Sequence, residues 1–134
     1  MTKNKHTLIA WLRDAHAMER TSVDTLDRLA ERLSRFPELA AQFREHWRTS
    51  IAQVQDIEKC LKTLGSDTST FKDLTSRFMG IAQAYAVTVV PDEVVKDCLA
   101  AYASRHFEIA AYVALGAAAL SLEEPDVARM CDSI

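Results

Sequence analysis

The stretch RHFEIAAY, residues 105–112, decides the fold because it places two charges, Arg105 and Glu108, inside an otherwise apolar helical pattern. Apolar residues continue the same three- and four-residue spacing on both sides of it, from Val94 to Ala119. This spacing is typical of an amphipathic helix with a buried apolar face. Because a buried charge is stable only when it is paired, the stretch predicts a polar centre within a helical bundle.

The same spacing predicts three more long helices before this stretch. The first spans about residues 7–34, and the second begins at Pro37, which suits the first turn of a helix. Turn-forming residues 65–70 end the second helix and precede a third, which starts at Phe71. The third helix reaches the β-branched run 87–90, which we interpret as a helix end or connector because it has no second strand to pair with.

The fourth helix begins near Pro91, and a short fifth helix runs from Glu124 to about Asp132. Helices in this order predict an all-α fold, an up-down-up-down four-helix bundle with a short C-terminal fifth helix. With three Gly and three Pro in 134 residues, the composition also favours helix. A chain of this length can bury its own core, so we expect residues 1–134 to form one domain.

Charge and hydropathy exclude several classes of function. Sixteen basic and nineteen acidic side chains give a net charge of -3, without a basic stripe for nucleic acid. The least charged stretch, residues 107–122, contains Glu108 and is rich in Ala, which is typical of a core helix and not of a membrane span. The N-terminal residues lead into a charged amphipathic helix and not into an apolar signal core, so we expect a cytoplasmic protein.

Catalytic motifs are missing from the sequence. It contains no Gly-rich phosphate loop, no GxSxG and no HExxH, so nucleotide hydrolysis, serine hydrolysis and zincin chemistry find no support. Cys60, Cys98 and Cys131 are odd in number and widely spaced, and we interpret them as structural thiols in a reducing compartment.

The apolar stripes of the first and second helices are interrupted as well, by Glu19 and Gln53. If the first two helices pack antiparallel about a turn near residue 36, Glu19 and Gln53 lie at the same height along the bundle axis. A second turn near residue 91 likewise places Met79 close to the height of Arg105 and Glu108. The levels carry an error of about one helical turn, roughly 5 Å. The four polar side chains are therefore expected to form one site.

Two alternatives remain open for these residues. Glu19, Gln53 and Glu108 can rotate to the helix edges and be solvated, and Arg105 can extend to the surface with its stem packed on the bundle. His46 precedes Gln53 by seven residues, roughly 10 Å along the helix axis, which favours a hydrogen-bonded core or edge histidine over a metal ligand.

Aromatic residues supply two further expectations. Tyr112 lies one turn beyond Glu108 and is expected to hydrogen-bond to it. Trp47 and Ile51 form a second apolar ridge beside the main stripe of their helix, and Trp11 is a similar residue on the first helix. Such a ridge indicates either a dimer face or packing under the fifth helix.

Three segments carry a resemblance to a known family: LRDAHAMER (12–20), HWRTSIAQ (46–53) and, above all, RHFEIAAY (105–112). They resemble the YciE/YciF-type ferritin-like proteins, a stress-associated bacterial family, over about residues 7–132. The string HFEIAAY is similar to the family's EHYEIASY-like signature. The resemblance implies a ferritin-like four-helix bundle with an added C-terminal helix, commonly a homodimer, whose central carboxylates suit a di-iron centre.

The sequence departs from the ligand pattern that the resemblance implies. Thr49, Met79 and Arg105 stand where the family pattern would have acidic residues, while Glu19, Gln53 and Glu108 are retained. A di-iron site needs about four carboxylates together with His or other donors. We therefore expect a metal-free centre in which Arg105 takes the electrostatic role of the metal, by bridging Glu19 and Glu108 with charge-assisted hydrogen bonds.

The favoured function is accordingly non-enzymatic: a stress-associated structural or interaction protein, homodimeric, with no catalytic residue and no cofactor. One alternative is a redox or peroxide-handling protein that binds iron or manganese, di-iron or mononuclear, through Glu19, Gln53, Glu108 and His46. Another is a helical adaptor with an unidentified protein partner and only a superficial match to the family. The sequence favours neither nucleic-acid nor membrane binding.

Overall fold

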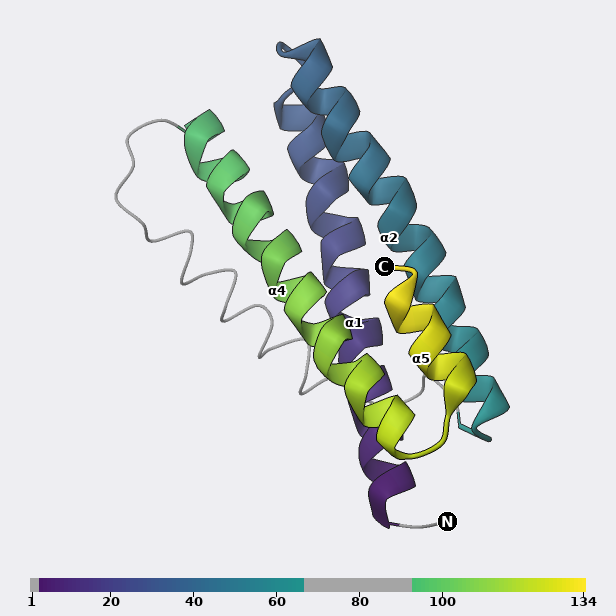
Figure 1. Ribbon diagram of the computed structural model, residues 1–134. Helices are drawn as coiled ribbons and strands as arrows, with labels where there is room; N and C mark the ends of the chain where they lie inside the picture. The colour runs from purple at the N-terminus through teal and green to yellow at the C-terminus, as the bar shows by residue number, and fades with distance from the viewer. Residues whose placement is uncertain (1–2, 67–92) are drawn as a thin grey trace.

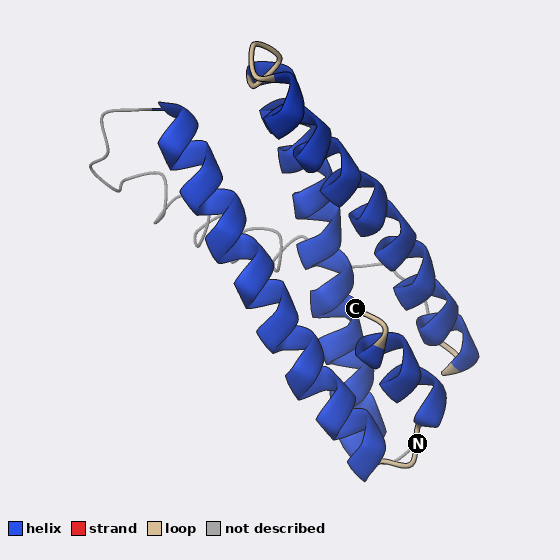
Figure 2. Cartoon of the chain, turned by 45° about the horizontal axis from the view of Figure 1, so that its top comes forward, coloured by secondary structure: helices blue, strands red, loops and turns tan. Residues whose placement is uncertain are grey.

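The computed structural model describes residues 3–66 and 93–134, which form three long helices and one short one (Figure 1). These are α1 (Lys3–Arg32), α2 (Pro37–Thr63), α4 (Glu93–Ser121) and α5 (Pro125–Asp132). The predicted all-α class is confirmed, and the described residues contain no strand (Figure 2). The predicted third helix and Met79 lie outside the described residues.

Local sequence signals set the boundaries of α2. Pro37 is at the first position of the helix, where a missing backbone N–H costs no hydrogen bond. At the other end Gly65 has a φ of 75°. The Ser66 N–H donates to the Leu61 carbonyl at 2.8 Å, and the Gly65 N–H donates to the Lys62 carbonyl at 3.0 Å. This is a Schellman motif, which requires a left-handed residue that glycine adopts without strain.

The directions of α1, α2 and α4 are those of the first, second and fourth helices of an up-down-up-down bundle. α2 is antiparallel to α1 and packs along it, and α4 also runs antiparallel to α1 (Figure 1). α5 turns back from the end of α4 and packs on both α4 and α2. Gly116 allows α5 to approach α4 closely, since a Cβ at this position would meet the Cβ of Cys131 at 3.2 Å. The short helix thereby covers the gap between α4 and α2 at one end of the bundle.

The interior has two apolar clusters. One, the α5 cluster, lies where α5 covers the bundle, and it contains Leu8, Leu12, Ile57, Leu61, Tyr112, Leu115 and Val127 among others. The other, the hairpin cluster, lies near the α1–α2 turn and contains Leu26, Leu29, Ala30, Leu33 and Phe43. Along α1 the buried polar residues Glu19 and Ser22 fall between the two clusters. A polar layer therefore divides the core.

Among the residues that the structure describes, no helix combines the length and the apolar character needed to cross a membrane.

The turn between α4 and α5 contains a strained residue. Glu123 has a φ of 57°, and its N–H donates to the Leu120 carbonyl at 3.2 Å while the Glu124 N–H donates to the Ala119 carbonyl at 2.9 Å. A left-handed conformation costs an L-residue about 1–2 kcal/mol. Glycine removes this cost, but its larger unfolded-state entropy cancels part of the gain. We expect Glu123→Gly to raise the free energy of unfolding by about 1 kcal/mol in urea titrations.

Glu123→Ala is the matched control because it removes the same charge but keeps the Cβ. It should leave the unfolding free energy nearly unchanged. Equal stabilisation by Ala and Gly would mean that the charge, and not the backbone conformation, is responsible.

Candidate functional site

The polar layer between the two apolar clusters is the candidate site. Glu19, Ser50 and Glu108 have relative exposures of 0%, and Ser22 and Gln53 are also buried. α1 supplies Glu19 and Ser22, α2 supplies Ser50 and Gln53, and α4 supplies Glu108. Helical spacing therefore placed Glu19, Gln53 and Glu108 correctly, and the solvated-edge alternative does not hold for them.

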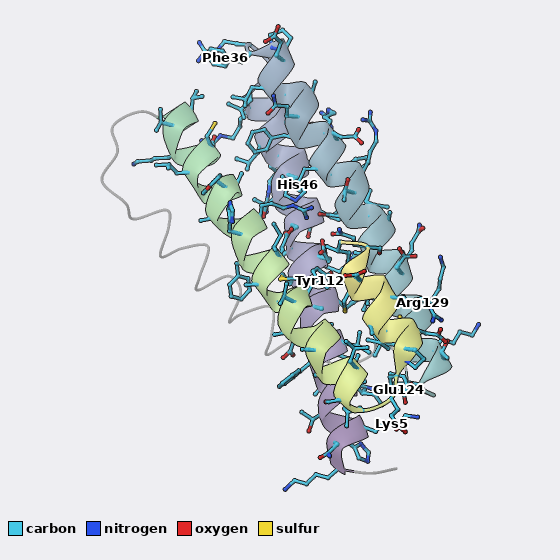
Figure 3. All side chains as sticks on the ribbon, viewed as in Figure 1. Lys5, Phe36, His46, Tyr112, Glu124 and Arg129 are labelled. Carbon is cyan, nitrogen blue, oxygen red and sulfur yellow. The ribbon has the colours of Figure 1, made fainter. Side chains whose placement is uncertain are left out.

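Glu108 is an ionised carboxylate surrounded by donors. Ser22 Oγ donates to its Oε1 at 2.5 Å, and Arg105 Nη1 donates to its Oε2 at 3.1 Å. His46 Nε2 lies 3.4 Å from the same Oε2 (Figure 3 labels His46). Burial alone raises the pKa of Glu108, but the hydrogen bonds from His46, Ser22 and Arg105 outweigh it and hold the pKa below its ordinary value. Glu108 therefore carries the negative charge of the layer.

Glu19 has a different environment. The Tyr112 hydroxyl donates to its Oε1 at 2.7 Å, and the Gln53 amide, oriented with its nitrogen toward Glu19, donates to the same oxygen at 2.8 Å. Burial, and next the negative charge of Glu108, raise the pKa of Glu19 to about 7. Tyr112 remains a donor because burial and the nearby Glu19 raise its own pKa far above neutrality. Below about pH 7 the layer therefore carries one negative charge, on Glu108, while Glu19 holds a proton.

Ser50 completes the surroundings of Glu19. Its hydroxyl is close enough to lower the Glu19 pKa, yet Oγ is fully buried and has no hydrogen bond of normal geometry within the described part of the chain. A buried hydroxyl without a partner costs about 1–3 kcal/mol. The lowering effect of Ser50 on the Glu19 pKa is that of a hydroxyl near an ionised carboxylate, and burial together with Glu108 outweighs it.

Arg105 occupies the rim of the layer, and its side chain is 32% exposed. The prediction that it bridges Glu19 and Glu108 is wrong in one half: in the described residues its guanidinium binds Glu108 alone. Glu19 obtains its neutralisation from a proton and its hydrogen bonds from Tyr112 and Gln53. Arg105 therefore balances the negative charge of Glu108 and not that of Glu19.

The partners of Tyr112, His46 and Ser22 can be compared with what the sequence predicts. Tyr112 donates to Glu19 across the bundle and not to Glu108 on its own helix. His46 is a hydrogen-bonded histidine, as expected, and its partner is Glu108. Ser22 was not singled out in the sequence, although it follows Glu19 by three residues and so shares its helix face. That spacing beside a buried acid is the signal that could have identified Ser22.

The described residues do not fit a di-iron centre. They contain no group of three or more His, Cys, Asp or Glu side chains arranged to hold a metal ion. The oxygens of Glu19 and Glu108 face N–H and O–H donors, and the cationic Arg105 stands beside Glu108. At a position where the family pattern has an acid, the Thr49 hydroxyl donates to the Glu45 carbonyl. Two carboxylates carrying donors are too few to neutralise two cations.

The cysteines stand apart from this layer. Cys60 and Cys131 are buried, Cys98 is half-buried, and none of the three forms a disulfide. Burial raises the pKa of Cys131 to about 12 and also raises that of Cys60. Because the thiolate is the reactive form, these two cysteines are poor nucleophiles.

The helix order and the carboxylate layer define a ferritin-like helical bundle, and solved structures share this fold. A protein from Xanthomonas campestris pv. campestris is 32% identical, with a TM-score of 0.80, and the match covers 98% of this chain and 81% of that one. The E. coli stress protein YciF is 22% identical, with a TM-score of 0.81 and coverages of 99% and 86%. YcfI from Rhodopseudomonas palustris is 21% identical, with a TM-score of 0.77 and coverages of 99% and 86%.

Residues 3–134 match the family described as "Domain of unknown function (DUF892)", and the chain belongs to this family. The predicted resemblance to YciE/YciF-type proteins is thereby confirmed.

Glu19 makes stability depend on pH. Between its ordinary value of 4.5 and its folded value of about 7, the folded state retains the Glu19 proton while the unfolded state releases it. The free energy of unfolding therefore falls as pH rises through this range, by on the order of 3 kcal/mol in total. Glutamine at position 19 is neutral at every pH. The Glu19→Gln variant should therefore lose this fall of the unfolding free energy with pH, measured by urea titrations between about pH 5 and 8.

Glu31→Gln is the control, because Glu31 is an exposed carboxylate on α1 and its neutralisation should preserve the slope. Below the ordinary carboxyl pKa the sign reverses, since the lowered pKa of Glu108 means that protonating it destabilises the fold. Parallel profiles for the wild type and Glu19→Gln would show that Glu19 does not hold the buried proton.

Proposed function

We propose that this protein is a ferritin-like bundle without a working metal centre, acting as a stress-associated structural or interaction protein and not as an enzyme. One observation carries the proposal: the Arg105 guanidinium binds Glu108 at 3.1 Å, where the fold would otherwise have a metal-binding carboxylate pair. Arginine remains charged at all physiological pH values and presents its donors in a fixed fork. It supplies a permanent positive charge that needs no metal.

Energetics support this role for Arg105. A fully buried carboxylate such as Glu108 is costly unless it is paired, and removing one partner of a buried pair costs about 3–5 kcal/mol. Arg105 is partly exposed, so its own contribution is expected below that range. Together with Ser22 and His46 it lets the bundle keep an ionised carboxylate inside without a metal.

The link to stress comes from the relatives. YciF of E. coli is described as a stress protein, and it has the same fold at 22% identity. We extend this role to the present chain because it belongs to the same family. A cytoplasmic location is part of the proposal, and it agrees with the acidic net charge of -3 and the reduced cysteines.

Metal content tests the metal-free centre. Protein purified from cells supplied with iron or manganese is expected to contain much less than one metal ion per chain by elemental analysis. Stoichiometric metal would instead support the alternative, an iron or manganese centre that uses Glu19, Gln53, Glu108 and His46.

Arg105→Glu is the most informative substitution. It restores an acidic residue three positions before Glu108, so we expect metal affinity to increase and the metal-free form to be less stable than wild type. Arg105→Gln is the matched control, because it removes the positive charge without adding a ligand. It should lower stability without increasing metal affinity, and an equal gain of metal by both variants would contradict the proposal.

A homodimer is the second part of the proposal. The apolar ridge of Trp47 and Ile51 on α2 gives little support to a dimer, because both side chains are half-buried and Trp47 packs on the hairpin cluster. Trp11 on α1 is more accessible, at 45% exposure. The larger exposed apolar surface is on α4, with Leu99, Tyr102, Ile109, Val113 and Leu120. Such a contiguous apolar surface is typical of protein interfaces. We propose that α4 contacts a second copy of the chain.

Sedimentation velocity tests the interface. The wild type is expected to be a dimer, and Val113→Glu should dissociate it, since Val113 is 69% exposed near the middle of this surface. Trp11→Glu on α1 is the control and should remain dimeric. A monomeric wild type, or dissociation by the α1 variant alone, would rule out the α4 interface.

A further inference from the structure

Two of the three cysteines lie where α5 packs on α2 (Figure 1). Cys60 is on α2 and Cys131 is on α5, and both belong to the α5 cluster, with exposures of 9% and 6%. Cys60 is close enough to Cys131 to raise its pKa, and Asp126 of α5 has the same effect on Cys60. The two thiols are therefore neighbours across the α2–α5 interface.

The short helix α5 is expected to open without unfolding of the whole bundle. It has eight residues, a length at which an isolated helix is not stable in water. Its buried side chains are Val127, Ala128 and Cys131. An element held by so few buried side chains opens at a lower free energy than the global fold. Such an opening carries Cys131 out of the core and uncovers Cys60.

This opening controls the reactivity of both thiols. While α5 is docked, burial raises the pKa of Cys60 and of Cys131, so neither forms the reactive thiolate readily. In the open state both thiols meet water, where a cysteine has a pKa of about 8.5. Because one chain carries both groups, the return of α5 brings them together at a high effective concentration. A small oxidant that reacts with one thiol therefore leaves it beside the other.

We propose that Cys60 and Cys131 form a site of oxidative modification, at which hydrogen peroxide converts the two thiols into a disulfide that fixes α5 to α2. One sulfur takes an OH from the peroxide and becomes a sulfenic acid, and the other peroxide oxygen leaves as water. The second thiol then attacks the sulfenic sulfur, which forms the S–S bond and releases another water. The two thiols together lose two electrons and two protons, and the peroxide takes up both.

The disulfide changes the bundle by removing the open state of α5. It closes a loop over residues 61–130, which restricts the unfolded chain as well. The α5 cluster also contains Tyr112, the donor to Glu19, so a fixed α5 keeps water away from that hydrogen bond. This inference goes beyond the structural role proposed above and does not depend on it, because thiol oxidation proceeds in the same way whether or not the polar layer holds a metal.

Peptide mapping of the oxidised full chain tests the pairing. The reduced protein is treated with hydrogen peroxide, the remaining thiols are blocked with iodoacetamide in denaturant, and the chain is cut with trypsin. The expected product joins residues 60–62 to residues 130–134, and dithiothreitol should separate the two peptides. Cys98 is an internal control, because it packs against the hairpin cluster, and it should be recovered with the iodoacetamide label.

Four variants test the bond and the opening of α5. Cys98→Ala should give the linked product as the wild type does, and Cys131→Ala should give none. Val127→Ala truncates a side chain of α5 that is 2% exposed, so the linked product should form at least about fivefold faster. Leu26→Ala makes a similar truncation in the hairpin cluster and should change this rate by less than about twofold.

Amide hydrogen exchange measures the effect on α5. In the linked protein, residues 125–132 should exchange at least about tenfold more slowly than in the reduced protein, because α5 can no longer leave α2. Unchanged exchange would overturn this effect. Absence of the linked peptides, a link to Cys98 instead, or links only between separate chains would overturn the pairing. Equal acceleration by Val127→Ala and Leu26→Ala would overturn the opening of α5 as the step that exposes the thiols.

Discussion

The structure depends on neutralising two carboxylates that are buried in one layer of a helical bundle. Glu19 and Glu108 are both fully inaccessible to solvent, and two ionised carboxylates at close range in such a site would be strongly destabilising. The bundle avoids this repulsion because a proton neutralises Glu19 and the Arg105 guanidinium balances the charge of Glu108. Glu19 retains its proton to about pH 7, and Glu108 is held ionised by Arg105, Ser22 and His46.

This division of roles also determines the packing around the layer. One donor to each carboxylate comes across the α1–α4 interface: Tyr112 of α4 reaches Glu19 of α1, and Ser22 of α1 reaches Glu108 of α4. The two hydrogen bonds cross the same interface in opposite directions. They join α1 to α4 between the two apolar clusters, and they specify the relative height of the helices more strictly than apolar contacts can.

Within the ferritin-like fold, a charged centre normally calls for metal ions. Here a guanidinium lies beside Glu108, and hydroxyl, amide and imidazole groups face the carboxylates. In the proposal made above, an arginine in place of a metal would preserve the charge balance of the bundle without supplying the open coordination positions that redox chemistry needs. A shared fold by itself does not fix the chemistry of a site, which depends on the side chains that line it.

The sequence by itself determined the helices and their inward faces. Pro37 and Gly65 set the ends of α2, and helical spacing put Glu19, Gln53 and Glu108 inside, because the period of a helix fixes which side of its own axis a residue occupies. Only the tertiary structure decided the partners: Tyr112 on Glu19, His46 on Glu108, and Arg105 on one carboxylate instead of two. Those choices depend on the translation and rotation of one helix against another and on side-chain rotamers, which the spacing along a single helix does not contain.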